Sequence, residues 1–86
     1  MPRVSEFYGI VISVQYAECL PPHFQAQYGS ESASIGIATL EVLSGSLPAR
    51  ALALVEEWAA QHQAALMRNW RLARAALPLD QIPPLS

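Results

Sequence analysis

The sequence is poor in charge and contains a single cysteine. Only 14% of its 86 residues are charged, and its five basic residues are all arginines, set against seven acidic residues. Because the formal net charge is −2 and lysine is absent, broad electrostatic binding to nucleic acid is not expected. The lone Cys19 has no cysteine to pair with, so we expect a reducing, cytoplasmic setting.

Segments that direct a chain to a membrane are also missing. Residues 1–6 lack the basic-then-apolar order of a signal peptide, and no uncharged apolar run reaches about 18 residues. The sequence has no Gly-rich phosphate loop, no Gly-x-Ser-x-Gly elbow and no paired-cysteine metal signature. We therefore predict no membrane span, no cofactor and no metal, and whether the protein is an enzyme stays open.

What the sequence does have is a large apolar fraction in a short chain. Hydrophobic residues make up 52% of it, which excludes a disordered chain. We expect one domain over residues 1–86, and a chain of this length buries only about 60% of its surface, so a monomer is marginally stable. A partner is therefore expected, and a homodimer is the simplest form of one.

Alternating apolar residues predict a small antiparallel sheet of three to four strands over about residues 4–43. Residues 10–16 and 23–28 both alternate, and a third strand follows the turn at Gly29. Residues 39–43 fit neither period, and they form either a fourth short strand or a single helical turn. The side chains expected to face the core are Ile10, Ile12, Val14, Tyr16, Phe24, Ala26, Tyr28, Ala33, Ile35 and Ile37.

One long amphipathic helix is predicted over about residues 47–76, ended by Pro78 and followed by a Pro-rich tail over residues 78–86. Such a helix is about 45 Å long, whereas a strand of this sheet spans roughly 23 Å, so the sheet cannot cover the whole helix. The uncovered half requires one of three solutions: the tail folding back, a kink that makes two helices, or a helix from a second subunit. We favour dimerisation.

The expected fold is α+β, with one sheet face packed on the helix and the other face open. The open face carries hydrogen-bonding side chains, namely Ser13, Gln15, His23, Gln25, Gln27 and Ser34. For partner binding we predict two glutamines of this face and four residues of the helix stripe: Gln25, Gln27, Trp58, His62, Leu66 and Trp70. The alternative for the two indoles and for His62 is ordinary packing in the core.

Three arginines, Arg68, Arg71 and Arg74, lie at three-residue intervals near the end of the predicted helix. Cations at this end complement the helix dipole, so a solvated face accounts for them. The alternative is a narrow contact with phosphate or RNA.

Several blocks of the sequence occur in a characteristic order. They are MPRVSEFYGI at residues 1–10, Pro-Pro-His-Phe at residues 21–24 and LEVLSGSLP at residues 40–48, followed by Trp58 and His62. Together they cover nearly the whole chain and resemble the domain of unknown function 4160 family. The resemblance implies a small bacterial protein, often encoded beside a protein of the domain of unknown function 2442 family, in a two-gene module similar to a toxin and antitoxin.

The resemblance also directs attention to the start of the second predicted strand. Members of that family usually carry Asp-His shortly before Pro-Pro-His-Phe-His, and the corresponding positions here are Glu18, Cys19, His23 and Gln25. A carboxylate with several imidazoles could bind a metal or share a proton, but Gln25 does neither well. Glu18, Cys19 and His23 are therefore candidate catalytic residues in a site that this member could have lost. The alternative is a solvated His23 and a Cys19 that packs as a small hydrophobe.

Three functions remain. The one that we favour is a protein-binding component of a two-gene module, either homodimeric or paired with the adjacent-gene protein. The second is a small hydrolase or nuclease, with or without a metal, centred on His23. The third is a regulator that contacts nucleic acid through the three arginines.

Overall fold

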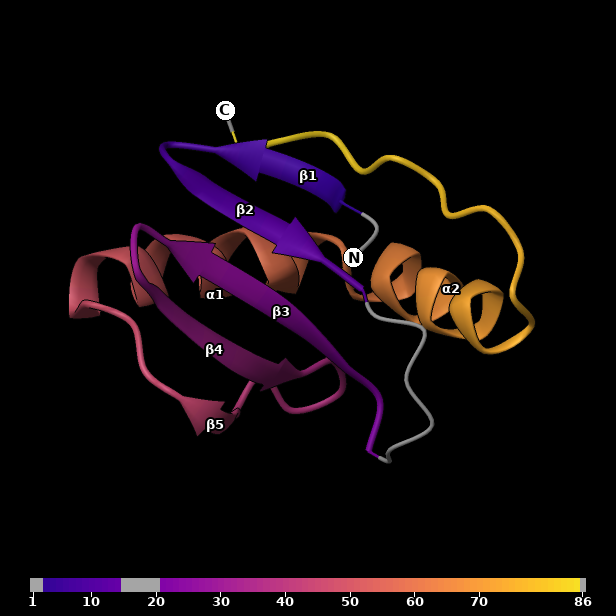
Figure 1. Cartoon of the computed structure of the whole chain (residues 1–86), viewed down its shortest axis with the longest axis horizontal. Coiled ribbons are helices and arrows are strands. Elements are labelled where there is room, and N and C mark those ends of the chain that lie inside the picture. Colours follow the sequence, from indigo (N-terminus) through magenta and orange to yellow (C-terminus); the bar gives the residue numbers. More distant parts are fainter. Residues whose placement is uncertain (1–2, 15–20, 86) are drawn as a thin grey trace.

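The computed structural model describes residues 3–14 and 21–85, which form five strands followed by two helices (Figure 1). The strands are β1 (Arg3–Phe7), β2 (Ile10–Ser13), β3 (His23–Tyr28), β4 (Glu31–Gly36) and β5 (Val42–Gly45), and the helices are α1 (Ala49–Gln61) and α2 (Gln63–Arg74). The strands pair antiparallel in chain order, so the sheet is a simple meander. The predicted α+β class is confirmed, but the prediction of three to four strands and one long helix is wrong in both counts.

The strand that the sequence did not reveal, β1, is disguised by a bulge. The pairing of β1 with β2 shifts register between Arg3 and Ser5, so Val4 is an extra residue in the ladder. Val4 and Ser5 are consequently both buried, which interrupts the alternation by which a strand is recognised.

The ambiguous residues 39–43 contain a turn and then the start of a strand. The Leu40 N–H donates to the Gly36 carbonyl (2.9 Å), and the Gly36 N–H donates to the Glu41 carbonyl (2.9 Å). These two bonds close the turn and place β5 beside β4, where β5 forms one edge of the sheet. The strand alternative for this segment is therefore the correct one.

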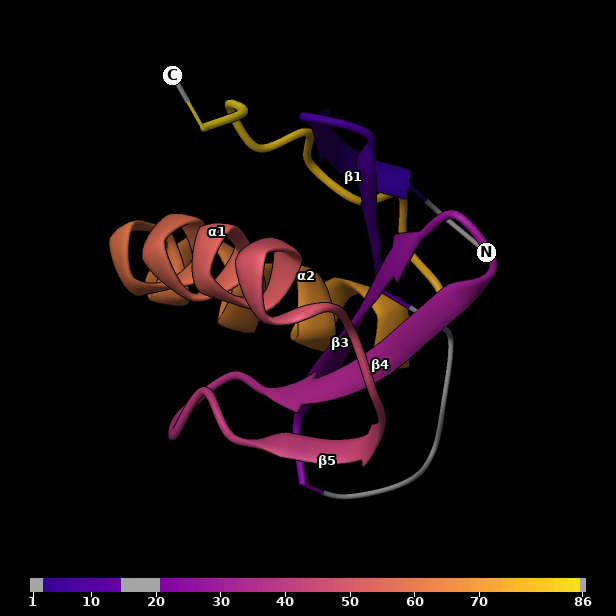
Figure 2. The same ribbon diagram turned by 90° about the vertical axis from the view of Figure 1, so that its left-hand side faces the viewer.

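One face of the sheet supplies much of the core, as the alternation predicts. The described residues of the expected core set are all buried except Tyr28, which lies at the end of β3 and is 42% exposed. Tyr16 lies outside the described residues. α1 covers this inner face (Figure 2) and buries Val55, Trp58 and Ala59 completely.

The predicted long helix is broken at His62. α1 ends at Gln61, α2 begins at Gln63, and His62 between them has a non-helical backbone (φ −129°, ψ 25°). Because α1 is only about 20 Å long, it matches the length of a six-residue strand. Gln63 Nε2 donates to the Ile37 carbonyl (2.9 Å), which ties the start of α2 to the chain beyond β4. Neither of these two helices is both long and apolar enough to span a membrane.

The Pro-rich tail folds back over the molecule. Its Ile82 is buried and donates its N–H to the Val4 carbonyl of β1 (2.8 Å), and its Pro83 carbonyl accepts a hydrogen bond from Trp58 Nε1 (2.8 Å). Figure 1 shows the tail running from α2 to the β1 edge of the sheet. The kink and the folded tail, two of the three solutions expected for the uncovered helix, therefore occur together.

Candidate binding surfaces

Among the described residues, neither helix covers the centre of the sheet face opposite α1 (Figure 2), although α2 packs on its end at His23. Its centre lies on β3 and β4, where Gln25 pairs with Ser34. On the same strands, Gln27 pairs with Ser32. Gln25 Nε2 donates to Ser34 Oγ (3.0 Å), and Gln27 Nε2 donates to the Gly29 carbonyl (3.5 Å). The two glutamines predicted to bind a partner therefore lie together on this outer sheet face, which we define by Gln25, Gln27, Ser32 and Ser34.

The outer sheet face carries no excess charge. Its nearest charged side chains on β1, Arg3 and Glu6, form an ion pair with each other (3.1 Å). Ser13, which we expected to be exposed, is buried, and Gln15 lies outside the described residues. What this face offers is a set of amide and hydroxyl groups, which form hydrogen bonds without requiring a charged ligand.

His23 begins β3 and is held by two neighbours. Its ring centroid lies 5.2 Å from that of Trp70 on α2, and its Nδ1 lies 3.0 Å from the Pro21 carbonyl oxygen. Because a carbonyl can only accept, Nδ1 donates this hydrogen bond, which leaves Nε2 as the nitrogen that could serve a general base. The two contacts hold the His23 ring in one orientation, which a general base requires.

The other predicted catalytic residues, Glu18 and Cys19, lie outside the described residues. Their distance from His23, and with it the catalytic site, stays a prediction. Within residues 3–14 and 21–85, no group of three or more His, Cys, Asp and Glu side chains is placed to hold a metal ion.

Three of the helix residues predicted to bind a partner lie in the interior of the single chain. Trp58 and Leu66 are fully buried and Trp70 nearly so. Trp58 packs edge-on against Phe24 of β3, with 6.1 Å between ring centroids. These three side chains offer no surface to a partner in this fold, because the break at His62 lets both helices pack against their own chain. His62 itself is half-buried, and its ring lies 5.3 Å from that of Trp58.

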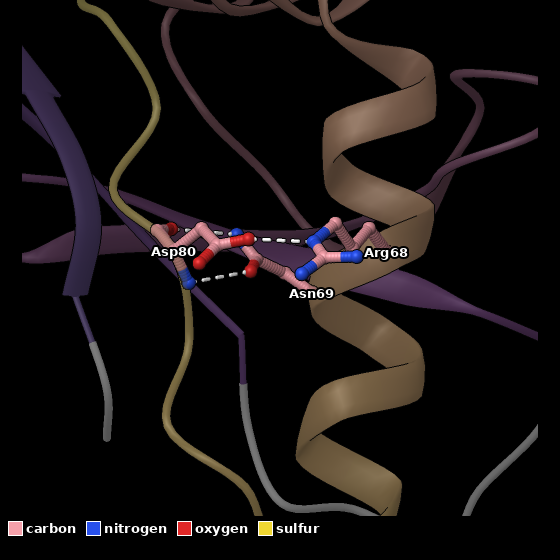
Figure 3. Close-up of polar contacts among 3 residues, drawn as sticks. All are labelled: Arg68, Asn69 and Asp80. Atoms are coloured by element: carbon pink, nitrogen blue, oxygen red, sulfur yellow. Dashed lines mark hydrogen bonds and ion pairs between the residues drawn. The ribbon is translucent and has the colours of Figure 1, made fainter.

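The arginine row on α2 is partly neutralised by the tail (Figure 3). Arg68 Nε lies 2.7 Å from Asp80 Oδ2. The neighbouring Asn69 holds the Asp80 backbone through two hydrogen bonds, from its Nδ2 to the carbonyl (2.9 Å) and from the Asp80 N–H to its Oδ1 (2.8 Å). Arg71 and Arg74 stay exposed in the last turn, where they complement the helix dipole. With Arg68 engaged, no observation favours nucleic-acid binding by this row.

A groove of about 630 Å³ lies between α1 and one end of the inner sheet face, and sequence reasoning missed it. α1 contributes Arg50, Leu54 and Glu57, the turn between β1 and β2 contributes Tyr8, β3 contributes Tyr28, and the tail contributes Leu85. The spacing of the three helix residues, which places them on one side of a helix, is the signal that could have indicated a shared surface. We call this feature the α1 groove.

A family model described as domain of unknown function (DUF4160) matches residues 9–71, which is most of the chain. The matched range includes the outer sheet face, the first helix and most of the second. No curated protein and no solved structure matches the chain.

Proposed function

The chain belongs to the DUF4160 family, and we propose that it is a protein-binding component of a two-gene, toxin–antitoxin-like module. The observation that supports this function is the uncharged centre of the outer sheet face, which neither helix covers. We propose the product of the adjacent gene as its partner and the cytoplasm as its location. A second copy of the chain is the alternative partner.

The chemistry of the outer sheet face favours a protein over other large ligands. Nucleic acid requires unpaired cations, but the arginine beside this face is paired with Glu6. A membrane surface requires apolar and basic side chains, whereas the centre of the face consists of two glutamines and two serines. Protein interfaces use such groups readily, with direct and water-mediated hydrogen bonds around a desolvated centre.

Co-expression with the adjacent-gene protein tests this proposal. We expect the two proteins to purify together and to give a single complex by multi-angle light scattering. If the chain forms a homodimer and does not bind the adjacent-gene product, the partner is a second copy of the chain. A monomer that also ignores that product would refute the proposed function.

Substitution at the outer sheet face locates the interface. We expect Gln27→Arg to weaken the complex at least about tenfold, because a long cation would be desolvated against a surface that fits an amide. Gln61→Arg, which makes the same change on the exposed end of α1, is the matched control and should leave the affinity unchanged. Equal effects of the two substitutions would place the interface elsewhere.

The orientation of His23, held by Pro21 and Trp70, supports a second candidate function, a small hydrolase or nuclease. His23→Ala should then abolish any growth arrest that overexpression of the chain causes in a bacterial host. His62→Ala is the matched control, since it also removes a half-buried imidazole packed on a tryptophan. Growth arrest that persists in a folded His23→Ala variant, or no arrest by the unaltered chain, would eliminate this candidate.

A further inference from the structure

The two edges of the sheet differ in how they are protected. The β1 edge carries a bulge and the charged pair of Arg3 and Glu6. The tail also covers this edge, because the Ile82 N–H donates to the Val4 carbonyl (2.8 Å). Charges, bulges and a covering segment are the means by which proteins keep a sheet edge from pairing with a strand of another chain. The β1 edge is therefore closed to strand addition.

The opposite edge of the sheet is formed by β5, whose sequence Val-Leu-Ser-Gly contains neither a charged residue nor proline. All four of its residues are exposed, including the apolar Val42 (39%) and Leu43 (43%). Within the described residues, β5 is the last strand of the sheet, and no strand pairs with its second side (Figure 1). An uncharged, apolar edge of this kind is suited to pair with a strand of another chain.

The backbone of β5 turns hydrogen-bonding groups away from β4 at two positions. The Glu41 carbonyl accepts a hydrogen bond from β4 (2.9 Å), so the Val42 N–H, on the opposite side of the same trans peptide unit, points away from β4. In the same way, the Ser46 N–H donates to a carbonyl of β4 (3.1 Å), which turns the Gly45 carbonyl outward. The outer side of β5 therefore has a donor at its first residue and an acceptor at its last.

A bulge gives these two residues the spacing of a regular strand. The first residue of β5, Val42, pairs with Ile35 of β4. The last residue, Gly45, pairs with Ala33, which lies two residues from Ile35, so Leu43 is the extra residue in the ladder. Val42 and Gly45 consequently occupy equivalent positions of the ladder and turn their backbones the same way. An antiparallel copy of β5 reverses their order, which places each donor opposite an acceptor at both ends.

From this self-complementary edge we infer that β5 is a self-association site, at which two copies of the chain pair their β5 strands antiparallel around a two-fold axis. The Val42 N–H of each copy donates to the Gly45 carbonyl of the other. The two sheets join into one continuous sheet, with both α1 helices on one side and both outer sheet faces on the other. The outer sheet face lies on β3 and β4, so this site is separate from the surface of the proposed function.

Charge does not oppose this pairing. The charged residue nearest to β5 in the sequence is Glu41, which directly precedes it. With Val42 of one copy opposite Gly45 of the other, the two Glu41 residues lie at opposite ends of the paired strands and do not meet. The two Leu43 residues instead lie beside the two-fold axis. Because only four residues of each strand take part, the interface is small, and we expect a weak, reversible dimer.

Sedimentation velocity of the full chain, from about 10 µM to about 1 mM, tests this inference in the range where small interfaces associate. The average sedimentation coefficient should rise with concentration toward that of a dimer. Leu43→Lys should raise the dissociation constant at least about tenfold, because it brings two like charges together beside the axis. Leu77→Lys makes the same change at an exposed leucine beyond α2 and should leave the dissociation constant unchanged.

A mixture of two variants separates a lost contact from a lost fold. Leu43→Glu should weaken self-association as Leu43→Lys does. An equimolar mixture of the two variants should nevertheless form a heterodimer, because opposite charges then meet beside the axis. A variant that fails to fold cannot be rescued in this way. In the unaltered chain, hydrogen exchange of the Val42 amide should also slow at high concentration, since pairing covers this N–H.

The inference is wrong if the unaltered chain shows no concentration dependence, if Leu43→Lys and Leu77→Lys have equal effects, if the mixture of Lys and Glu variants stays monomeric, or if exchange at Val42 does not slow in the dimer.

The Gln27→Arg variant separates this site from the proposed function. Gln27 lies on β3, which β4 separates from β5, so this variant should self-associate as the unaltered chain does even though it loses the protein partner. Self-association that is weakened by Gln27→Arg but not by Leu43→Lys would place the second copy on the outer sheet face and contradict the inference. A complex with the adjacent-gene protein that fails to form leaves the β5 result unaffected, so either idea can fail while the other holds.

Discussion

Ser5 places a polar atom in the core of the protein. The bulge in β1 turns this side chain inward, and Ser5 Oγ is buried without a hydrogen-bond partner among the described residues. Burying a hydroxyl group without a partner costs about 1 to 3 kcal/mol. We therefore expect Ser5→Ala to raise the free energy of unfolding by about 1 kcal/mol, measured by urea denaturation.

The matched control for this prediction is Ser32→Ala, on the exposed outer sheet face. Its effect should remain within about 0.5 kcal/mol, as is usual for surface substitutions. A Ser5→Ala variant that is less stable than the unaltered chain would mean that the hydroxyl group does have a partner.

Ala76 stores strain at the end of α2. The helix closes with a hydrogen bond from the Leu77 N–H to the Leu72 carbonyl (2.9 Å), which requires a left-handed residue at position 76 (φ 57°). Glycine adopts this conformation without a steric penalty. Ala76→Gly should therefore raise the melting temperature and stabilise the fold by about 0.5 to 1 kcal/mol.

Ala75→Gly is the control for the helix end, because Ala75 has an ordinary backbone conformation (φ −87°). It should be neutral or destabilising, since glycine there only adds freedom to the unfolded chain. If both glycine variants are destabilised alike, strain at position 76 is not the cause.

At the scale of single residues, the alternation in the sequence predicted the inner face of the sheet but not its limits. Phe24 and Ala26 are buried as expected, whereas Tyr28 continues the same pattern and is exposed. The pattern reports only which side of a strand a residue occupies. The alternation cannot show whether α1 covers the end of β3, because α1 is far away in the sequence. In the structure, this end of β3 lies beside a groove and is not covered by the helix.

Asn69 connects two elements of the fold, α2 and the tail. Its fully buried amide makes both hydrogen bonds to the Asp80 backbone, so it binds the tail as a neighbouring strand would. Asn69→Ala leaves the two backbone groups of Asp80 without these partners. We expect a loss of about 2 to 3 kcal/mol in the free energy of unfolding, measured by urea denaturation.

Arg68→Ala tests whether charge or amide geometry holds the tail. The ion pair of Arg68 with Asp80 is exposed, with 66% and 58% of the two side chains accessible, so its loss should cost less than about 1 kcal/mol. A larger loss in Arg68→Ala than in Asn69→Ala would contradict the assignment of the tail's anchor to Asn69.

The break between the helices was not predictable from local signals. No proline or glycine stands near His62, and apolar residues continue at helical spacing from Val55 through Leu66. The length of the helix was the useful clue, because it exceeded what the sheet could cover. The length indicated that the apolar side of the helix beyond the sheet had to be buried by another part of the protein or by a partner. Whether a kink, the tail or a second subunit buries it depends on tertiary contacts.

At the scale of the whole molecule, the dimensions explain the break. An unbroken helix over residues 49–74 would be about 39 Å long, whereas the longest dimension of the protein is 33 Å. Breaking the helix lets both halves bury their apolar sides on one small core. The apolar stripe that suggested a second subunit is thereby largely covered from within.

The tail should accordingly govern both stability and association. Deleting residues 78–86 removes the buried Ile82 and its hydrogen bond to Val4, and it uncovers the Trp58 indole. We expect a loss of about 3 kcal/mol or more and concentration-dependent association relative to the full chain, measured by sedimentation velocity.

Ile82→Ala in the full chain tests the same point if the shortened chain does not fold. It keeps the backbone hydrogen bonds and should cost about 2 to 3 kcal/mol through the lost burial. A shortened chain as stable and as little associated as the full chain would show that the tail is dispensable.

The positions of the two tryptophans allow intrinsic fluorescence to report on two separate regions of the protein. Trp58 is hydrogen-bonded to the tail, and Trp70 lies against the first residue of β3. In a Trp70→Phe variant, Trp58 is the remaining indole and the tail covers it. The wavelength of its emission maximum would therefore report whether the tail is docked or released. With Trp58 replaced instead, the emission would follow the surroundings of His23, and the two regions can be observed separately without an attached dye.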